Sequence, residues 1–231
     1  MVLVDLFNKR KSLLAPNLHS NKNIKKPKLN KSVLAVYIYP KIGMNLLAYI
    51  EQSSGQLSPK LKAEISSMTK IERHPKAAIL LREGEVCRKV FFVEKGCLRF
   101  YYYDDEGKDI THWFVFEGEF ITEIDSVFQQ KPSEFYIEAL EDCTLNTFIF
   151  ADFIALIGEH KQITMFSFML MMKSIIELGE KVKDLQFRNA EIRYKNLIEK
   201  HSDILLRVPL SYIASYLGIT QQSLSRIRRE K

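Results

Sequence analysis

Glutamine and arginine side chains recur near the C-terminal end of the chain at a spacing that places them on one face of a helix. The polar or cationic positions of that face are Gln221, Gln222, Ser225, Arg226 and Arg229. Leu224 and Ile227 fit the opposite, apolar face. A glutamine amide can bond N6 and N7 of adenine, and an arginine guanidinium can bond O6 and N7 of guanine. The pattern therefore indicates a helix that reads base edges in a DNA groove.

The two kinds of DNA contact can be divided by residue type and position. The residues expected at base edges are Gln221, Gln222 and Arg226. The residues expected at phosphates are Thr220, Ser225, Arg228 and Arg229. Phosphate contacts add affinity without sequence information, because every duplex presents the same backbone.

A second short helix is predicted immediately before this one. Its inner face is formed by Leu210, Ile213, Ala214 and Leu217, at i, i+3, i+4 and i+7. Pro209 suits its first turn, Gly218 can take the left-handed conformation that ends a helix, and Thr220 can cap the next one. Two helices joined by such a turn match a helix-turn-helix. The alternative is a helical hairpin within a core, which has no need of the cationic outer face.

A long helix is predicted over residues 152–186, which contain no proline. Six positions in it follow the 3-4 spacing of a heptad seam: Met165, Phe168, Met172, Ile175, Gly179 and Val182. We expect this seam to form a homodimer interface, while another stripe packs on the preceding domain. The alternative is one helix buried within a single subunit. A further helix over 189–201 is expected to turn Ile192, Leu197 and Ile198 inward.

Six short segments upstream are rich in β-branched and aromatic residues. They are 77–81, 89–93, 97–103, 110–116, 135–140 and 144–150. Glycines in the turns between them supply positive φ at little steric cost. So many short strands within about 75 residues imply an antiparallel roll or barrel.

Charge is unevenly distributed along the chain. Residues 1–43 carry nine Lys/Arg and one acid, residues 44–185 have a net charge of −7, and residues 186–231 have a net charge of +5. We interpret 1–43 as a basic flexible arm, with a possible short strand at 33–39; Met44 is an alternative native start. An acidic module joined to a basic one fits a protein that contacts a polyanion at one end.

Several function classes find no support in the residues. Cys87, Cys97 and Cys143 form no C-x-x-C motif, which favours idle thiols in a reducing compartment. The longest apolar run is too short for a bilayer, and the start lacks the features of a secretory signal, so we expect a cytoplasmic protein with no membrane partner. No recognised catalytic motif occurs, so an enzyme is not expected. Histidine spacing predicts no metal site.

From Met44 to Lys231 the chain resembles the Crp/Fnr family of transcription regulators, in its Bacteroidetes-type branch. The resemblance is carried by the C-terminal VPLSYIASYLGITQQSLSRIRR, the turn at 82–85, the strand end at 93–96 and the run at 118–123. It implies an α+β fold: a cyclic-nucleotide-binding-like antiparallel β-roll for effector sensing (44–158), a dimerisation helix (159–187) and a C-terminal helix-turn-helix domain (188–231).

The same resemblance implies site residues and partners. Arg226 corresponds to the family's base-reading arginine, and Glu123 to the acid that holds a ribose hydroxyl. Ser133 is a second candidate ligand contact, but the family's phosphate-binding arginine is missing from 131–135, where Glu134 would oppose an anion. Cyclic AMP is therefore not the expected effector, and no cofactor is predicted. Double-stranded DNA and RNA polymerase are the implied partners.

The sequence thus predicts a regulator that binds a two-fold-symmetric operator as a homodimer, with possible control by a small molecule in the β-roll. The alternative hypothesis is a ligand-sensing module that acts on a protein partner and does not bind DNA. The cationic face of 221–231 favours the first.

Overall fold

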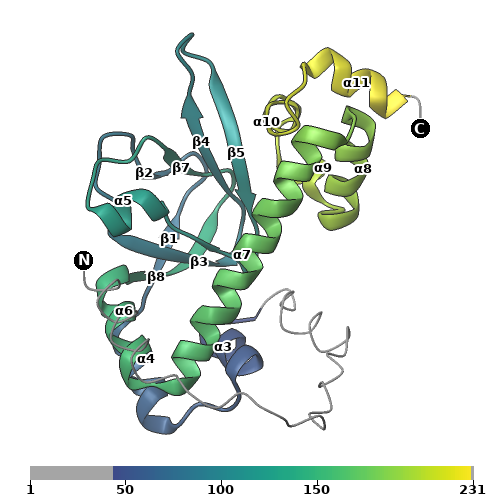
Figure 1. The fold of residues 1–231 in the computed structure, drawn as a ribbon. Coiled ribbons are helices and arrows are strands. Elements are labelled where there is room, and N and C mark those ends of the chain that lie inside the picture. Colours follow the sequence, from purple (N-terminus) through teal and green to yellow (C-terminus); the bar gives the residue numbers. More distant parts are fainter. Residues whose placement is uncertain (1–43, 230–231) are drawn as a thin grey trace, which may run out of the picture. The chain divides into compact units, whose positions relative to one another are not determined.

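The computed structural model describes residues 44–229 (Figure 1). Two short helices come first, α3 (Leu46–Ser54) and α4 (Pro59–Met68). The Asn45 side chain accepts a hydrogen bond from the Ala48 N–H at 2.9 Å, and Ser58 caps α4 in the same way. The arm predicted at 1–43, with its short strand, lies outside the described residues.

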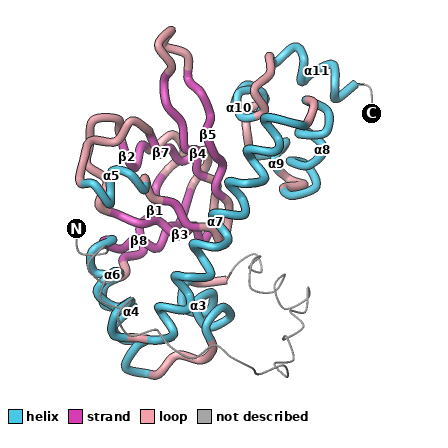
Figure 2. Tube along the Cα trace, in the orientation of Figure 1, coloured by secondary structure: helices cyan, strands magenta, loops and turns pink. Residues whose placement is uncertain are grey.

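Eight strands of the described residues form an antiparallel β-roll, drawn in magenta in Figure 2. They are β1 (Lys70–His74), β2 (Ile79–Leu81), β3 (Lys89–Lys95), β4 (Leu98–Tyr103), β5 (Asp109–Val115), β6 (Phe120–Ile121), β7 (Tyr136–Ala139) and β8 (Cys143–Ile149). One sheet has the order β1-β8-β3-β6 and the other β2-β7-β4-β5. Together with the helices that follow, this confirms the predicted fold class.

The interior of the roll is apolar and tightly packed. Leu98, Ile137 and Leu145 are completely buried between the two sheets. Gly96, in the turn between β3 and β4, has φ +108°, and a Cβ atom built there would lie 2.5 Å from the Cys143 Sγ. Only glycine fits at this position, because both the backbone conformation and the close approach of β8 exclude a side chain.

All six predicted strands are present, with ends displaced by a few residues, but two strands were missed. β1 has the sequence Lys-Ile-Glu-Arg-His and pairs with β8 at the edge of a sheet, where its side chains are exposed or half-buried. β6 has only two residues, which pair with Phe91 and Phe92 of β3. Neither segment carries the apolar alternation that identifies a strand in a sequence.

The prediction of one continuous helix over residues 152–186 is wrong. The chain forms α6 (Phe150–Glu159) and α7 (Lys161–Phe187), with His160 in an extended conformation between them, at φ −122° and ψ 113°. The His160 N–H closes α6 on the Leu156 carbonyl, and the His160 imidazole lies 2.8 Å from the Glu64 carboxylate of α4. The contact with Glu64 could not be inferred from the sequence, but Gly158, two residues before the break, is a local signal that the prediction did not use.

One stripe of α7 packs on the roll, as expected. Ile163 and Phe166 are buried in a cluster with residues of α3 and β3. The Phe166 ring lies edge-on to Tyr49, with the ring centroids 5.8 Å apart. This contact fixes the N-terminal part of α7 against the roll.

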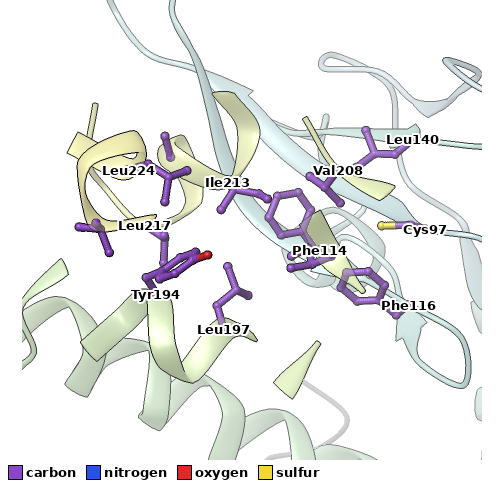
Figure 3. Close-up of a cluster of buried hydrophobic side chains, with 13 residues drawn as sticks. Cys97, Phe114, Phe116, Leu140, Tyr194, Leu197, Val208, Ile213, Leu217 and Leu224 are labelled. Carbon is purple, nitrogen blue, oxygen red and sulfur yellow. The ribbon is translucent and has the colours of Figure 1, made fainter. Parts of the chain in front are cut away.

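The chain ends in four helices, α8 (Ala190–Lys200), α9 (Ile204–Arg207), α10 (Leu210–Tyr216) and α11 (Gln221–Arg229). Their apolar side chains share a core with Phe114 and Phe116 from the end of β5, as Figure 3 shows. Leu197 is buried as predicted, but the prediction for Ile192 is wrong, since 45% of that residue is exposed.

Candidate nucleic-acid interface

Helices α10 and α11 form the predicted helix-turn-helix. Gly218 has φ +64°, the left-handed conformation that ends α10, and the Ile219 N–H bonds to the Ala214 carbonyl at 3.0 Å. The Thr220 Oγ1 then accepts a hydrogen bond from the Ser223 N–H at 3.1 Å, which caps α11. The turn chemistry predicted for these residues is therefore confirmed, except that Pro209 precedes the first turn of α10 instead of lying within it.

The two faces of α11 differ sharply. Leu224 and Ile227 are buried against Ile213 and Leu217 in the shared core. The exposed side chains are Gln221, Gln222, Arg226, Arg228 and Arg229, with Thr220 exposed just before the helix and Ser225 half-buried. The predicted base and phosphate contacts thus share one accessible surface, which we call the α11 outer face. Their contact with DNA stays a prediction.

Replacing Thr220 with alanine is expected to lower the free energy of unfolding by about 1 kcal/mol, because the Ser223 N–H loses its capping oxygen. Urea titration followed by circular dichroism would measure the change. Thr220→Ser keeps the oxygen and is expected to retain most of the stability. Equal stability of the alanine variant and the wild type would show that the cap does not hold α11.

The predicted dimer seam lies open on α7. Met165, Phe168, Met172, Ile175 and Val182 have between 37% and 55% of their surface exposed, and a Cβ atom at Gly179 would meet no neighbouring atom. Exposed Met171, Leu178 and Leu185 widen the apolar surface. One subunit therefore leaves these side chains uncovered, which is the arrangement expected before a second copy packs on them. The interface itself stays a prediction.

The two predicted ligand residues lie around α5 (Ile124–Gln129), and each makes hydrogen bonds within the loop that carries it. The buried Glu123 carboxylate caps α5, accepting from the Asp125 N–H at 3.1 Å and the Ser126 N–H at 2.6 Å. The buried Ser133 hydroxyl accepts from the Phe135 N–H and donates to the Phe135 carbonyl, both at 3.0 Å. Both groups order this loop, and a ligand contact by either stays a prediction.

Arg99 links the roll to the helix-turn-helix, and sequence reasoning missed it. Its side chain is 1% exposed, pairs with Asp109 at 2.9 Å and Glu138 at 3.5 Å, and donates to the Thr111 hydroxyl at 3.0 Å. The guanidinium also lies 3.6 Å from the ring centroid of Tyr212 in α10. A single arginine in an aromatic strand was the available signal, but its partner in α10 could not be inferred from it.

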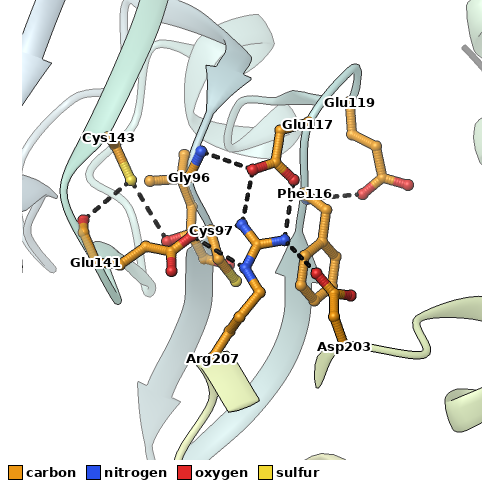
Figure 4. Close-up of polar contacts among 10 residues, drawn as sticks. Gly96, Cys97, Phe116, Glu117, Glu119, Glu141, Cys143, Asp203 and Arg207 are labelled. Carbon is orange, nitrogen blue, oxygen red and sulfur yellow. Dashed lines mark hydrogen bonds and ion pairs between the residues drawn. The ribbon is translucent and has the colours of Figure 1, made fainter. Parts of the chain in front are cut away.

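A second link joins α9 to two turns of the roll, as Figure 4 shows. The Arg207 guanidinium forms a two-pronged ion pair with Glu117, at 2.7 and 3.0 Å, and also contacts Glu141 and Asp203. Burial alone would raise the pKa of Glu117, but hydrogen bonds from Arg207 and from the Gly96 N–H outweigh it and lower that pKa. The carboxylate is thus held in its charged form.

The three thiols are free and buried. Burial raises the pKa of Cys143 to about 11 and raises that of Cys97 further. Since the thiolate is the nucleophile and the metal ligand, neither group is prepared for such chemistry at neutral pH. No helix of residues 44–229 has both the length and the apolar character that crossing a membrane requires.

A roll of this kind, joined through α7 to a helix-turn-helix, is the fold that the resemblance predicted. Residues 71–160 match the cyclic nucleotide-binding domain family. Among curated proteins, the cAMP-activated global transcriptional regulator CRP of Salmonella typhimurium and of Klebsiella aerogenes is 22% identical over 167 residues, which cover 68% of this chain and 80% of CRP.

Solved structures agree on the fold. A mutant of CooA from Carboxydothermus hydrogenoformans superposes with a TM-score of 0.60 at 20% identity, covering 82% of this chain and 85% of CooA. A Crp/Fnr regulator from Eubacterium rectale has a TM-score of 0.59 at 20% identity, and the match covers 75% of this chain and 83% of that regulator. FixK2 from Bradyrhizobium japonicum has a TM-score of 0.59 at 18% identity, and the match covers 70% of this chain and 83% of FixK2. The fold that the resemblance to the Crp/Fnr family predicted is therefore confirmed.

Proposed function

We propose that the chain is a sequence-specific DNA-binding transcription regulator that binds a two-fold-symmetric operator as a homodimer. The observation that carries the proposal is the α11 outer face, in which exposed Gln222 and Arg226 lie opposite buried Leu224 and Ile227. A helix that needed only to pack would not concentrate cations on its accessible side. In the major groove, this helix would place Gln221, Gln222 and Arg226 at base edges.

Two copies are needed for the proposed mode of binding. The open seam on α7 supplies an apolar surface for pairing, and the pair would read half-sites roughly 34 Å apart, one helical turn of DNA. We propose that the roll is the sensing part and that RNA polymerase is a further partner. Cyclic AMP is not the proposed effector, because residues 131–135 offer no arginine to a buried phosphate.

The test is selection of bound sequences from a random DNA pool, followed by gel-shift titration of the selected operator. A two-fold-symmetric consensus would support the proposal. If no fragment bound even at low salt, the proposed DNA binding would be refuted. The alternative, a ligand-sensing module that acts on a protein partner, would then remain.

Arg226→Ala is expected to weaken binding to the selected operator by about 1–3 kcal/mol per half-site, since a bidentate contact to guanine is lost. Binding to unrelated DNA should change little. Arg228→Ala is the matched control. Because Arg228 is expected at a phosphate, its loss should weaken binding to the operator and to unrelated DNA alike, and should reduce the salt dependence of binding by about one counterion. Unchanged operator affinity in Arg226→Ala would remove this residue from the base-reading set.

A further inference from the structure

A cleft with a volume of about 310 Å³ lies where the roll, α7 and the C-terminal helices meet. Its walls include Trp113 of β5, Ile176 and Lys181 of α7, Leu197 of α8 and Tyr216 of α10. Four aromatic or aliphatic side chains are thus combined in one concave site with charged ones, which are Glu177, Glu180, Lys181, Asp184, Arg188, Arg193 and Lys200.

Lys181 is one of four cationic side chains that line this cleft, with Arg188, Arg193 and Lys200. Its ammonium lies 3.4 Å from the ring centroid of Tyr216 and 5.7 Å from that of Trp113. It donates hydrogen bonds to the backbone carbonyls of His112 and Tyr216, at 3.2 and 3.4 Å. Burial lowers the pKa of Lys181 to about 8, because the folded protein disfavours the charged form of this amine.

The carboxylates around Lys181 are engaged elsewhere. Glu177 pairs with Lys200 at 3.0 Å, and Asp184 pairs with Arg188 and accepts a hydrogen bond from Asn196. Glu180 pairs with both Lys183 and Arg188. Within residues 44–229, no carboxylate lies within ion-pair distance of Lys181, although the Asp184 carboxylate favours its charged form from farther away. Such a cation is stabilised when an anion enters beside it.

We propose that this cleft binds a small organic carboxylate with a flat apolar body. The carboxylate would pair with the Lys181 ammonium, and the apolar body would lie against Trp113, Ile176 and Leu197. Neutral molecules of the same shape would bind more weakly, because they leave Lys181 without a counter-charge.

Most of the cleft faces away from the seam. Residues advance by about 100° around an α-helix, so Glu177 and Asp184 lie on the side of α7 opposite Ile175. Lys181 lies about 120° from Ile175, and Ile176 lies beside the seam residues Met172 and Gly179. A second copy on the seam would therefore approach the cleft at Ile176 and not at Glu177 or Asp184.

A ligand in this cleft would contact the sensing roll, the long helix and the helix-turn-helix at once. Binding of this ligand can be measured without DNA, so a failure of the proposed function would not refute the ligand site. An effect of the ligand on operator affinity would be a separate observation, since a ligand shifts an equilibrium only through unequal affinity for its two states.

The test uses the full chain and isothermal titration calorimetry with phenylacetate, benzoate and cyclohexanecarboxylate, each compared with its neutral amide. We expect saturable binding of at least one acid, with Kd on the order of 0.1–1 mM for so small a ligand, and about tenfold weaker binding of the amide. Trp113 is the only tryptophan of the chain, so a change in its fluorescence on titration would locate the ligand in the cleft.

Lys181→Met is expected to reduce the affinity for the acid about tenfold and to leave that for the amide unchanged. Lys195→Met is the matched control, because Lys195 is exposed and pairs with Glu199, and neither residue lines the cleft. Failure of all three acids to bind, or equal affinity for acid and amide in the wild type, would overturn the proposal. The amide comparison needs no variant, so it decides the matter even if Lys181→Met were to fold poorly.

Discussion

Replacing Arg207 with methionine is expected to lower the free energy of unfolding by about 3 kcal/mol, the low end of the range for removing one member of a buried ion pair. Methionine keeps most of the apolar stem but leaves Glu117 and Glu141 without their fork-shaped donor. The low end applies because the Arg207 side chain is still 17% exposed and water can reach part of the site. Urea unfolding monitored by circular dichroism gives the measurement.

Two further variants separate the ion pair from general effects of the substitution. Arg73→Met changes an exposed arginine of β1 and is expected to alter the stability by less than about 0.5 kcal/mol. In a double-mutant cycle, Glu117→Gln should lower the free energy of unfolding much less in the Arg207→Met background than in the wild type. Additive effects in that cycle would show that the two side chains do not stabilise each other.

Replacing Ile175 with aspartate is expected to convert the proposed dimer into monomers. Each interface would receive two carboxylates in an apolar seam, at a cost of about 3 kcal/mol or more, which raises the dimer Kd at least about a hundredfold. The subunit itself should fold normally, because Ile175 is 55% exposed in the single chain. Sedimentation velocity over a range of concentrations would report the change.

The neighbouring Ser174→Asp is the matched control for this variant. Ser174 is also exposed on α7 but lies at the edge of the apolar surface, beside Met171 and Leu178, so the same new charge there should weaken association much less. If Ile175→Asp sedimented as the same dimer as the wild type, the seam assignment would be wrong. Monomers from both variants would indicate a general effect of charge on α7.

The helix-turn-helix could be predicted because its signals are local. The left-handed Gly218, the capping Thr220 and the inward Leu224 are each specified by residues fewer than five positions away. The strands of the roll were predictable for the same reason, except where the chain pairs at an edge with a polar sequence, as in β1.

The links between the roll and the C-terminal helices could not be predicted. Arg207 lies 90 residues after Glu117 and 66 after Glu141, and nothing near any of them in the sequence specifies the pairing. The contact of His160 with Glu64 and the burial of Arg99 arise in the same way, from partners that only the folded chain brings together. Tertiary contacts decided these features where local propensity was silent.

The core around Phe114 and Phe116 has a consequence for the modular use of such proteins. Because the roll contributes side chains to the interior of the C-terminal helices, a graft that moved residues 188–231 onto another regulator would leave apolar rings bare on the donor and a hole in the transplanted part. A successful chimaera would have to carry the complementary face of the roll with it. By contrast, exchanging only the outward side chains of α11 changes none of that interior, which makes them the natural positions for changing the proposed operator preference.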